Sequence, residues 1–186
     1  MKLIIGITGA SGVIYGIRIL EELKKSGVET HLVISRWGRA AIVQETDYSV
    51  EKVASLASFS YDEEDLAAGI SSGSFKSDGM IVAPCSMKTL AGIACGYADD
   101  LITRAADVAI KEGRKLVLMP RETPLSAIHL ENMLKLSRIG VVIMPPVPAF
   151  YTNPRNLEEV INQTVGRALD QFGIEIEGYR RWGRGI

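Results

Sequence analysis

The stretch that decides the fold is Leu3-Ile4-Ile5-Gly6-Ile7-Thr8-Gly9-Ala10-Ser11-Gly12, near the start of the 186-residue chain. Its apolar run predicts a buried strand, and the glycine-rich segment that follows predicts a tight turn. Apolar residues then recur at helical spacing from Val13 to Leu23, up to Ser26-Gly27. Strand, tight turn and helix in this order are typical of the opening unit of a parallel sheet.

The same alternation of strand and helix continues along the chain. We expect further strands over residues 30–34, 79–83, 115–119 and 140–144, and helices over 36–45, 86–95, 101–112, 126–138 and 157–172. Residues 47–78 mix short helical patterns with a Ser/Gly-rich loop at 71–74. Continuously apolar strands separated by helices are typical of a parallel sheet covered on both faces. The sequence therefore predicts one α/β domain over residues 1–186, a three-layer sandwich with a central parallel sheet.

The composition excludes several classes of function. With 21 Lys+Arg and 22 Asp+Glu, the net charge of -1 favours neither nucleic acid nor an anionic membrane. No apolar run approaches ~20 residues and the N-terminus lacks a signal-peptide pattern, so we expect a cytoplasmic location. Cys85 and Cys95 would lie about 15 Å apart along a helix, too far for a disulfide, and are predicted to be reduced core residues. The two histidines, His31 and His129, have no metal-ligand spacing, so no metal site is predicted.

Polar or rigid loops follow each of the five predicted strands, where an open α/β sheet binds its ligand. These loops contain residues 9–12, 35–36, 84–89, 120–124 and 145–151. Glycines in the first loop permit a close approach to a ligand, and the amides that open the next helix favour an anion, although helix packing alone would also explain the glycines. No Gly-Lys-Ser/Thr follows, and the second strand ends in Ile34-Ser35 rather than an acidic residue. A mononucleotide such as FMN therefore fits better than NAD.

Two further loops carry candidate residues with structural alternatives. Ser86 begins a predicted helix, where a helix cap and a phosphate contact are both compatible with the sequence. Thr123 and Pro124 read as the start of a helix, which leaves the preceding Arg121-Glu122 pair as a site candidate.

Cations outside these loops are equally open to two interpretations. Arg104 and Lys111, seven residues apart on one helix, can lean toward one anion or form an ion-pair stripe with Asp100 and Asp107. The tail around Trp182 is either a frayed basic end or a flap whose ring covers a cation or a planar ligand.

Taken together, these motifs resemble the UbiX flavin prenyltransferases over almost the whole chain. The motifs that carry the resemblance are Thr8-Gly9-Ala10-Ser11-Gly12, Glu45-Thr46-Asp47, Pro84-Cys85-Ser86, Arg121-Glu122 and the segment Pro145 to Tyr151. The resemblance implies a flavodoxin-like fold that binds reduced FMN and dimethylallyl phosphate, joins the prenyl group to flavin N5 and closes a ring at C6. It also implies that no metal is needed, that the prenylated FMN serves UbiD-type decarboxylases, including the step in ubiquinone biosynthesis, and that the chain forms a homo-oligomer, commonly a dodecamer with shared sites.

The resemblance also assigns roles residue by residue. The flavin-binding positions are Gly9, Ala10, Ser11, Ser35, Ser86, Met87, Lys88, Thr89 and Arg121. Tyr151 and Arg167 fall on positions that bind the prenyl phosphate. The positions of Arg104, Lys111, Glu122, Glu45 and Trp182 are implied to act in catalysis: the first three at the phosphate, Glu45 near the flavin, and Trp182 in closing the site.

Two other functions are compatible with a flavin-binding fold. One is an FMN-dependent decarboxylase of the peptidyl-cysteine type, which resembles a pattern with an active-site histidine and a Pro-Ala-Ser-Ala-Asn segment. Here Pro84-Cys85-Ser86-Met87-Lys88-Thr89 occupies that place, and His31 lies in a predicted strand. The other is a non-catalytic flavin carrier, which would need no cations around a leaving phosphate.

Overall fold

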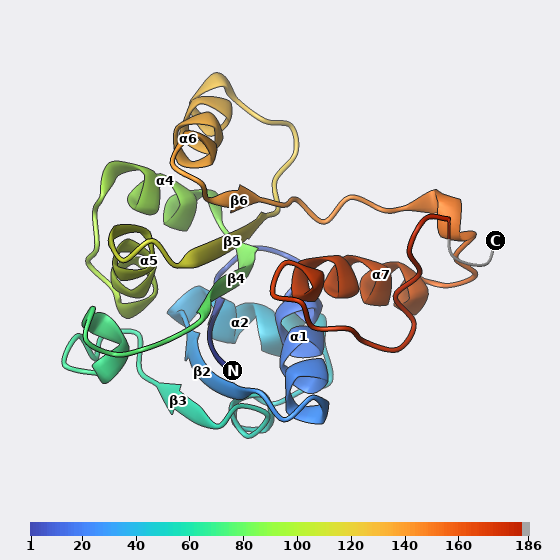
Figure 1. Cartoon of the computed structure of the whole chain (residues 1–186), viewed down its shortest axis with the longest axis horizontal. Helices are drawn as coiled ribbons and strands as arrows, with labels where there is room; N and C mark the ends of the chain where they lie inside the picture. The colour runs from blue at the N-terminus through green and yellow to red at the C-terminus, as the bar shows by residue number, and fades with distance from the viewer. Residues whose placement is uncertain (184–186) are drawn as a thin grey trace.

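A central sheet of six parallel strands organises the computed structural model, which describes residues 1–183 (Figure 1). The strands are β1 (Lys2–Ile7), β2 (Glu29–Ile34), β3 (Phe59–Tyr61), β4 (Gly79–Cys85), β5 (Lys115–Pro120) and β6 (Val142–Ile143). Their order in the sheet is β3-β2-β1-β4-β5-β6. This is the doubly wound order, in which the connections diverge on either side of β1 and β4 and leave a crevice at their carboxyl ends.

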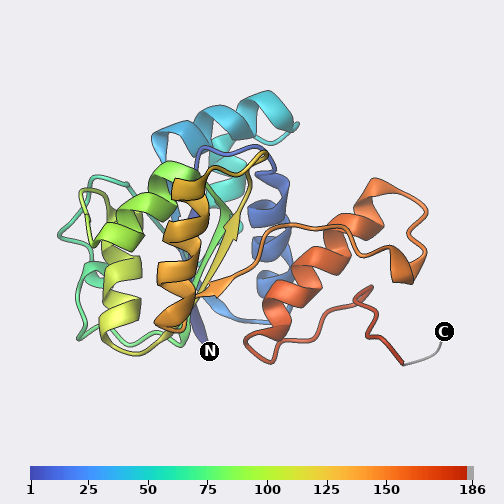
Figure 2. The same ribbon diagram turned by 90° about the horizontal axis from the view of Figure 1, so that it is seen from above.

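Helices cover both faces of the sheet, as Figure 2 shows from above. On one face lie α1 (Ile14–Lys25), α2 (Arg36–Glu45), α3 (Val50–Ala54) and α7 (Leu157–Asp170), and on the other lie α4 (Met87–Cys95), α5 (Leu101–Lys111) and α6 (Ala127–Arg138). Because successive side chains of a strand point to opposite faces, Leu3 and Ile5 join the core under α1 while Ile4 joins the core under α5. The predicted three-layer α/β sandwich with a central parallel sheet is confirmed.

The strand β3 was not predicted, and two other details of the sequence reading were wrong. Phe59-Ser60-Tyr61 is a short edge strand with an exposed outer face. It therefore has no apolar run from which a strand could be predicted. Helix α6 begins after Ser126, whose hydroxyl accepts a hydrogen bond from the His129 amide at 3.2 Å, so Thr123 does not start it. Cys85 is buried as expected, but Cys95 is exposed because it is the last residue of α4.

Close packing of two helices against the sheet brings their N-termini to its carboxyl edge. A Cβ added to Gly16 in α1 would lie 2.2 Å from the Ala83 carbonyl oxygen, and one added to Gly38 in α2 would lie 2.5 Å from the Ile7 carbonyl oxygen. Only glycine fits such contacts, so both helices approach the strand ends more closely than any other residue would allow.

The C-terminal part of the chain forms an arm beside the sheet. After β6, residues 144–156 extend away from the body and include a short 3₁₀ turn, η2 (Phe150–Thr152), before α7 returns to pack on α1 (Figure 1). A second 3₁₀ turn, η1 (Gly69–Ser71), lies between β3 and β4. None of the helices formed by residues 1–183 is long and apolar enough to cross a membrane.

Candidate functional site

A cleft of about 390 Å³ opens at the carboxyl edge of the sheet. The residues that line it are Gly9, Ser35, Arg36, Trp37, Glu63, Ser86, Lys88, Thr89 and Asp100. Gly9 follows β1, Ser35 follows β2 and Ser86 follows β4, so the ends of three neighbouring strands contribute. The structure thus brings together five residues that the sequence had assigned to flavin binding.

Hydroxyl groups connect the loops around the cleft. Thr8 Oγ1 donates to the Pro84 carbonyl at 2.8 Å and accepts from the Ser86 amide at 2.7 Å, which fixes the β1 loop against the β4 loop. Ser86 Oγ accepts from the Thr89 amide at 3.2 Å at the start of α4. Ser35 Oγ accepts from the Gly38 amide at 3.0 Å at the start of α2. Both serines are therefore helix caps, and two helix N-termini face one cleft, a favourable place for an anion.

The backbone of Gly9 forms part of the cleft wall because no side chain fits there. A Cβ at this position would lie 2.2 Å from the Cβ of Trp37, whose own side chain is 68% exposed. The neighbouring residues Ala10 and Ser11 lie on the turn between β1 and α1, and Ser11 is exposed. This turn can therefore present backbone groups directly to a planar ligand.

The Glu45 carboxylate accepts hydrogen bonds from the backbone amides at the start of α1. Its Oε2 accepts from the Gly12 amide at 2.8 Å and from the Val13 amide at 3.3 Å. The sequence predicted that these amides favour an anion, and the anion in the structure is a carboxylate of the same chain.

Arg121 and Glu122 lie at the same edge of the sheet, after β5. The Arg121 amide donates to the Cys85 carbonyl at 3.3 Å, so the loop runs alongside the residue that precedes Ser86. Glu122 accepts from the Thr123 amide at 3.0 Å, and both side chains are exposed. Met87, half-buried, is the first residue of α4.

Tyr151 and Trp182 form a second group on the arm, and Arg167 lies in the last turn of α7, the helix that follows it. Tyr151 and Trp182 pack edge to face, with ring centroids 5.3 Å apart, so the tail is folded against the arm and is not a frayed end. Arg167 pairs with Asp170 at 2.8 Å, and Asp170 also pairs with Arg181 at 2.5 Å. These two arginines hold the pKa of Asp170 below its usual range, with the Arg181 hydrogen bond as the largest cause.

Arg104 and Lys111 do not share an anion within one chain. Arg104 pairs with Asp107 at 2.9 Å and donates to the Ser71 carbonyl, while Lys111 pairs with Glu112 at 2.5 Å. Helix α5 begins at the carboxyl edge and ends before β5 begins, so Lys111 lies at the opposite edge of the sheet, about 15 Å along the helix axis from its start.

The sequence analysis missed Glu63. Its carboxylate accepts a hydrogen bond from the Arg36 amide at the start of α2, and its carbonyl accepts from the Leu101 amide at 2.7 Å. Glu63 therefore holds the rim of the cleft between α2 and α5. The acidic run at residues 62–65 was the available signal, but nothing in its spacing indicates which helix it meets.

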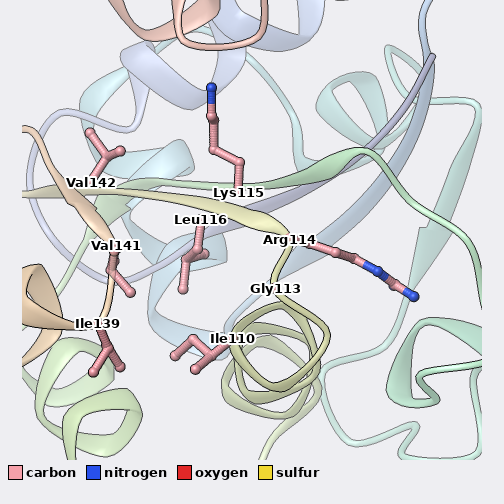
Figure 3. A pocket seen from close by; sticks show the side chains of 9 residues that line it. Ile110, Gly113, Arg114, Lys115, Leu116, Ile139, Val141 and Val142 are labelled. Atoms are coloured by element: carbon pink, nitrogen blue, oxygen red, sulfur yellow. The ribbon is translucent and has the colours of Figure 1, made fainter.

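A separate cavity of about 300 Å³ lies at the amino edge, between α5, β5 and β6. Ile110, Leu116, Ile139 and Val141 line it, and the charged groups of Arg114 and Lys115 point away from it (Figure 3). Its lining offers no side chain to orient a polar ligand. Over residues 1–183, no group of three or more His, Cys, Asp or Glu side chains is placed to hold a metal ion.

Comparisons with known proteins identify the family of the chain. The flavoprotein family model matches residues 1–168. A probable UbiX-like flavin prenyltransferase of Bacillus subtilis is 58% identical over 182 residues, which cover 98% of this chain and 89% of the relative. A mitochondrial flavin prenyltransferase of Saccharomyces cerevisiae is 60% identical over 181 residues, 97% of this chain and 75% of the relative.

Solved structures give the same result. The structure of a dodecameric FMN-dependent UbiX-like decarboxylase from Escherichia coli O157:H7 superposes with a TM-score of 0.96 at 60% identity, covering 98% of this chain and 99% of that one. The structure of AnUbiX in complex with FMN and dimethylallyl pyrophosphate gives a TM-score of 0.97 at 52% identity, covering 100% of this chain and 98% of that one. The chain therefore belongs to the flavoprotein family and, within it, to the UbiX-like flavin prenyltransferases.

Proposed function

We propose that this protein transfers a dimethylallyl group from dimethylallyl phosphate to N5 of reduced FMN and closes a ring at C6, which gives prenylated FMN. The observation that carries the proposal is the cleft at the carboxyl ends of β1, β2 and β4, in a chain 52–60% identical to flavin prenyltransferases and to a protein solved with FMN and a prenyl donor.

The residues of the cleft fit FMN. Two helix N-termini with serine hydroxyls suit the phosphate, with Ser35, Ser86 and Thr89 as its donors and Lys88 as a nearby cation. The bare backbone at Gly9, followed by Ala10 and Ser11, suits the flat ring system, and Met87 and Arg121 lie beside it on the next strand ends. When bound and reduced, the flavin supplies the nucleophilic nitrogen.

The protein's own residues then assist departure of the leaving group. The allylic C–O bond breaks with its electron pair going to the phosphate, so cations that bind the phosphate stabilise the developing charge. We assign phosphate binding to the Arg167 cation and to the Tyr151 hydroxyl. Trp182 excludes water from the allylic carbon. We assign the holding or moving of a proton to Glu122 and to Glu45 at the start of α1, two carboxylates at the sheet edge.

Lys111 requires a second copy of the chain to reach such a site. Lys111 ends α5 at the edge of the sheet opposite the cleft, so we propose that a neighbouring subunit supplies it together with Arg104. A homo-oligomer, in our proposal a dodecamer, is supported by the dodecameric relative and by the exposed apolar side chains Ile128, Leu130 and Leu134 on α6. We further propose that the product serves a UbiD-type decarboxylase, as in ubiquinone biosynthesis, and that the protein acts in the cytoplasm.

No structural observation favours the two alternatives. The peptidyl-cysteine decarboxylase EpiD shares the fold with a TM-score of 0.63 at 21% identity. His31 is buried in β2, 2.8 Å from the Tyr61 hydroxyl and 2.9 Å from Glu29, and does not line the cleft. A flavin carrier would not explain Arg167 on α7 and Tyr151 on the arm.

The deciding experiment is anaerobic incubation of the protein with reduced FMN and either dimethylallyl phosphate or its pyrophosphate, followed by mass spectrometry of the extracted flavin. We expect a gain of one prenyl unit. Arg167→Ala should abolish transfer but retain FMN binding, whereas Arg155→Ala, an exposed arginine on the arm, should leave transfer unchanged. Unmodified flavin bound to folded protein would contradict the proposal, and transfer that survives Arg167→Ala would contradict the assigned role of that residue.

A further inference from the structure

Gln163 is a nearly buried amide that connects α7, the arm and the tail. Its side chain is 5% exposed. Its Nε2 donates to the Tyr151 hydroxyl at 3.1 Å and to the Arg180 carbonyl at 2.9 Å, and its Oε1 accepts from the Arg180 amide at 3.0 Å. Both N–H groups and the oxygen are therefore used, which is what an amide in such a position needs.

The pair of bonds to Arg180 fixes which way the amide faces. Exchange of Oε1 and Nε2 would place an NH₂ group against the Arg180 N–H and an oxygen against the Arg180 carbonyl. The Gln163 atom that faces the Tyr151 hydroxyl is therefore Nε2, which donates the hydrogen bond. Since the Tyr151 oxygen is the acceptor of that bond, its own proton is left to donate elsewhere.

Tyr151 contacts an aromatic ring of the tail and the helix that carries Arg167. Arg167 stands four residues after Gln163, on the same face of α7. The Trp182 ring packs edge to face on Tyr151 at 82°. The tail that carries Trp182 lies directly on α7, because a Cβ added to Gly166 would be 2.5 Å from the Cβ of Tyr179.

We propose that Gln163 is a positioning residue that keeps the Tyr151 hydroxyl as a hydrogen-bond donor to the phosphate of the prenyl substrate. The inference rests on the proposed function, which assigns Tyr151 and Arg167 to that phosphate. Ionised phosphate oxygens mainly accept hydrogen bonds, so a tyrosine whose proton was already donated to its neighbour could not bind them. The direction of the Gln163–Tyr151 bond therefore sets the affinity for the substrate.

Reversal of that bond tests the inference. In Gln163→Glu, a side chain of nearly the same shape can still accept from the Arg180 amide, but its carboxylate accepts a hydrogen bond from the Tyr151 hydroxyl, whose proton is then no longer available to the phosphate. Calorimetry with dimethylallyl phosphate on protein loaded with oxidised FMN measures binding without turnover. We expect Gln163→Glu and Tyr151→Phe each to weaken that binding about tenfold, the loss of one hydrogen bond to a charged group. The affinity for FMN should stay within about twofold of the wild type in both variants.

The double variant and a control separate this effect from charge and from damage to the fold. Gln163→Glu combined with Tyr151→Phe should bind no more weakly than Tyr151→Phe alone, because the glutamate acts through the tyrosine hydroxyl. Gln171→Glu makes the same chemical change just beyond α7 and should bind dimethylallyl phosphate normally. Trypsin should cleave after Arg180 and Arg181 faster in Gln163→Glu, since the tail loses one of its bonds to α7.

Three results would overturn the inference: unchanged affinity in Gln163→Glu, a further loss in the double variant, or an equal loss of FMN affinity. Measurements on the wild-type protein distinguish a failure of this inference from a failure of the proposed function. A protein that binds dimethylallyl phosphate but transfers nothing contradicts the transferase, and its affinities still decide the role of Gln163. A wild type that binds no dimethylallyl phosphate overturns both.

Discussion

The Glu45 carboxylate satisfies two backbone amides where α1 begins, at a turn that also forms the cleft. A charged acceptor at a helix N-terminus typically contributes about 0.5–1 kcal/mol. We therefore expect Glu45→Gln to lower the free energy of unfolding by roughly that amount and Glu45→Ala by about 1–2 kcal/mol, measured by urea denaturation. Glu131→Gln, an exposed residue in the second turn of α6 and so beyond the first turn where the helix dipole acts, should be neutral; equal stability of the Glu45 and Glu131 variants would contradict this role.

The two thiols differ in their environment, and burial raises the pKa of the Cys85 thiol strongly. The thiolate is the reactive form, so Cys85 should be inert in the folded protein. In Cys95→Ser, a thiol-reactive dye should label nothing until denaturant is added, after which it should label Cys85. Rapid labelling of the folded variant would show that Cys85 is accessible.

Among the elements, α1 depends on a glycine at its contact with β4. A methyl group at Gly16 would meet the Ala83 carbonyl at 2.2 Å, and neither backbone can move away without disturbing the strand end. We expect Gly16→Ala to destabilise the fold by about 1–3 kcal/mol or more and to weaken FMN binding, because Ala83 precedes the loop of Ser86. Gly27→Ala, at a positive φ of 67° but in open space, is the control and should cost about 1 kcal/mol in thermal or urea unfolding. A smaller effect at Gly16 than at Gly27 would contradict the packing argument.

The tail is held on α7 by an ion pair whose strength depends on pH. Because the folded-state pKa of Asp170 is lowered, its contribution is fully present above the ordinary aspartate range and is lost as the pH falls through the lowered value. Trp182 fluorescence in a Trp37→Phe background should therefore be constant from neutral pH to about pH 5 and change only in stronger acid. Asp170→Asn should give the acid-type signal already at neutral pH. A tail signal in Asp170→Asn that matches its parent at all pH values would show that the pair does not hold the tail.

The sequence predicted the position and type of the strands that are buried on both faces and of the helices with one buried face. Strands β1, β4 and β5 and helix α5 have continuous or periodic apolar patterns, and the loops that follow the strands meet at one edge for topological reasons. Three-residue β3 has no such pattern. The partners of Glu45 and Glu63, and the contacts of Gln163 with the tail, depend on how distant segments pack, which periodicity does not encode.

At the scale of the whole molecule, Lys111 lies at the edge of the sheet opposite the cleft, which is the reason we propose that the active site is shared between subunits. If a neighbouring copy completes each cleft, Lys111→Ala and Arg121→Ala should each be inactive alone and should complement each other. Oligomers reassembled from equal amounts of both should recover about a quarter of wild-type prenyl transfer, since a complete site needs an intact cleft from one variant and Lys111 from the other. Each variant reassembled alone is the control. No recovery in verified mixed oligomers, or full activity in a monomer, would contradict the shared site.

The packing of α7 on α1 joins the last helix of the chain to the first. Val165, Ala168 and Leu169 complete the same core as Leu3, Ile5 and Ile17. During synthesis on the ribosome, the part of that core that α7 covers stays exposed until the final residues have emerged, although every strand and α1, α2 and α3 are already made. A chain interrupted before residue 157 would expose this apolar face to the cell, so premature termination should give aggregation or degradation rather than a shortened enzyme.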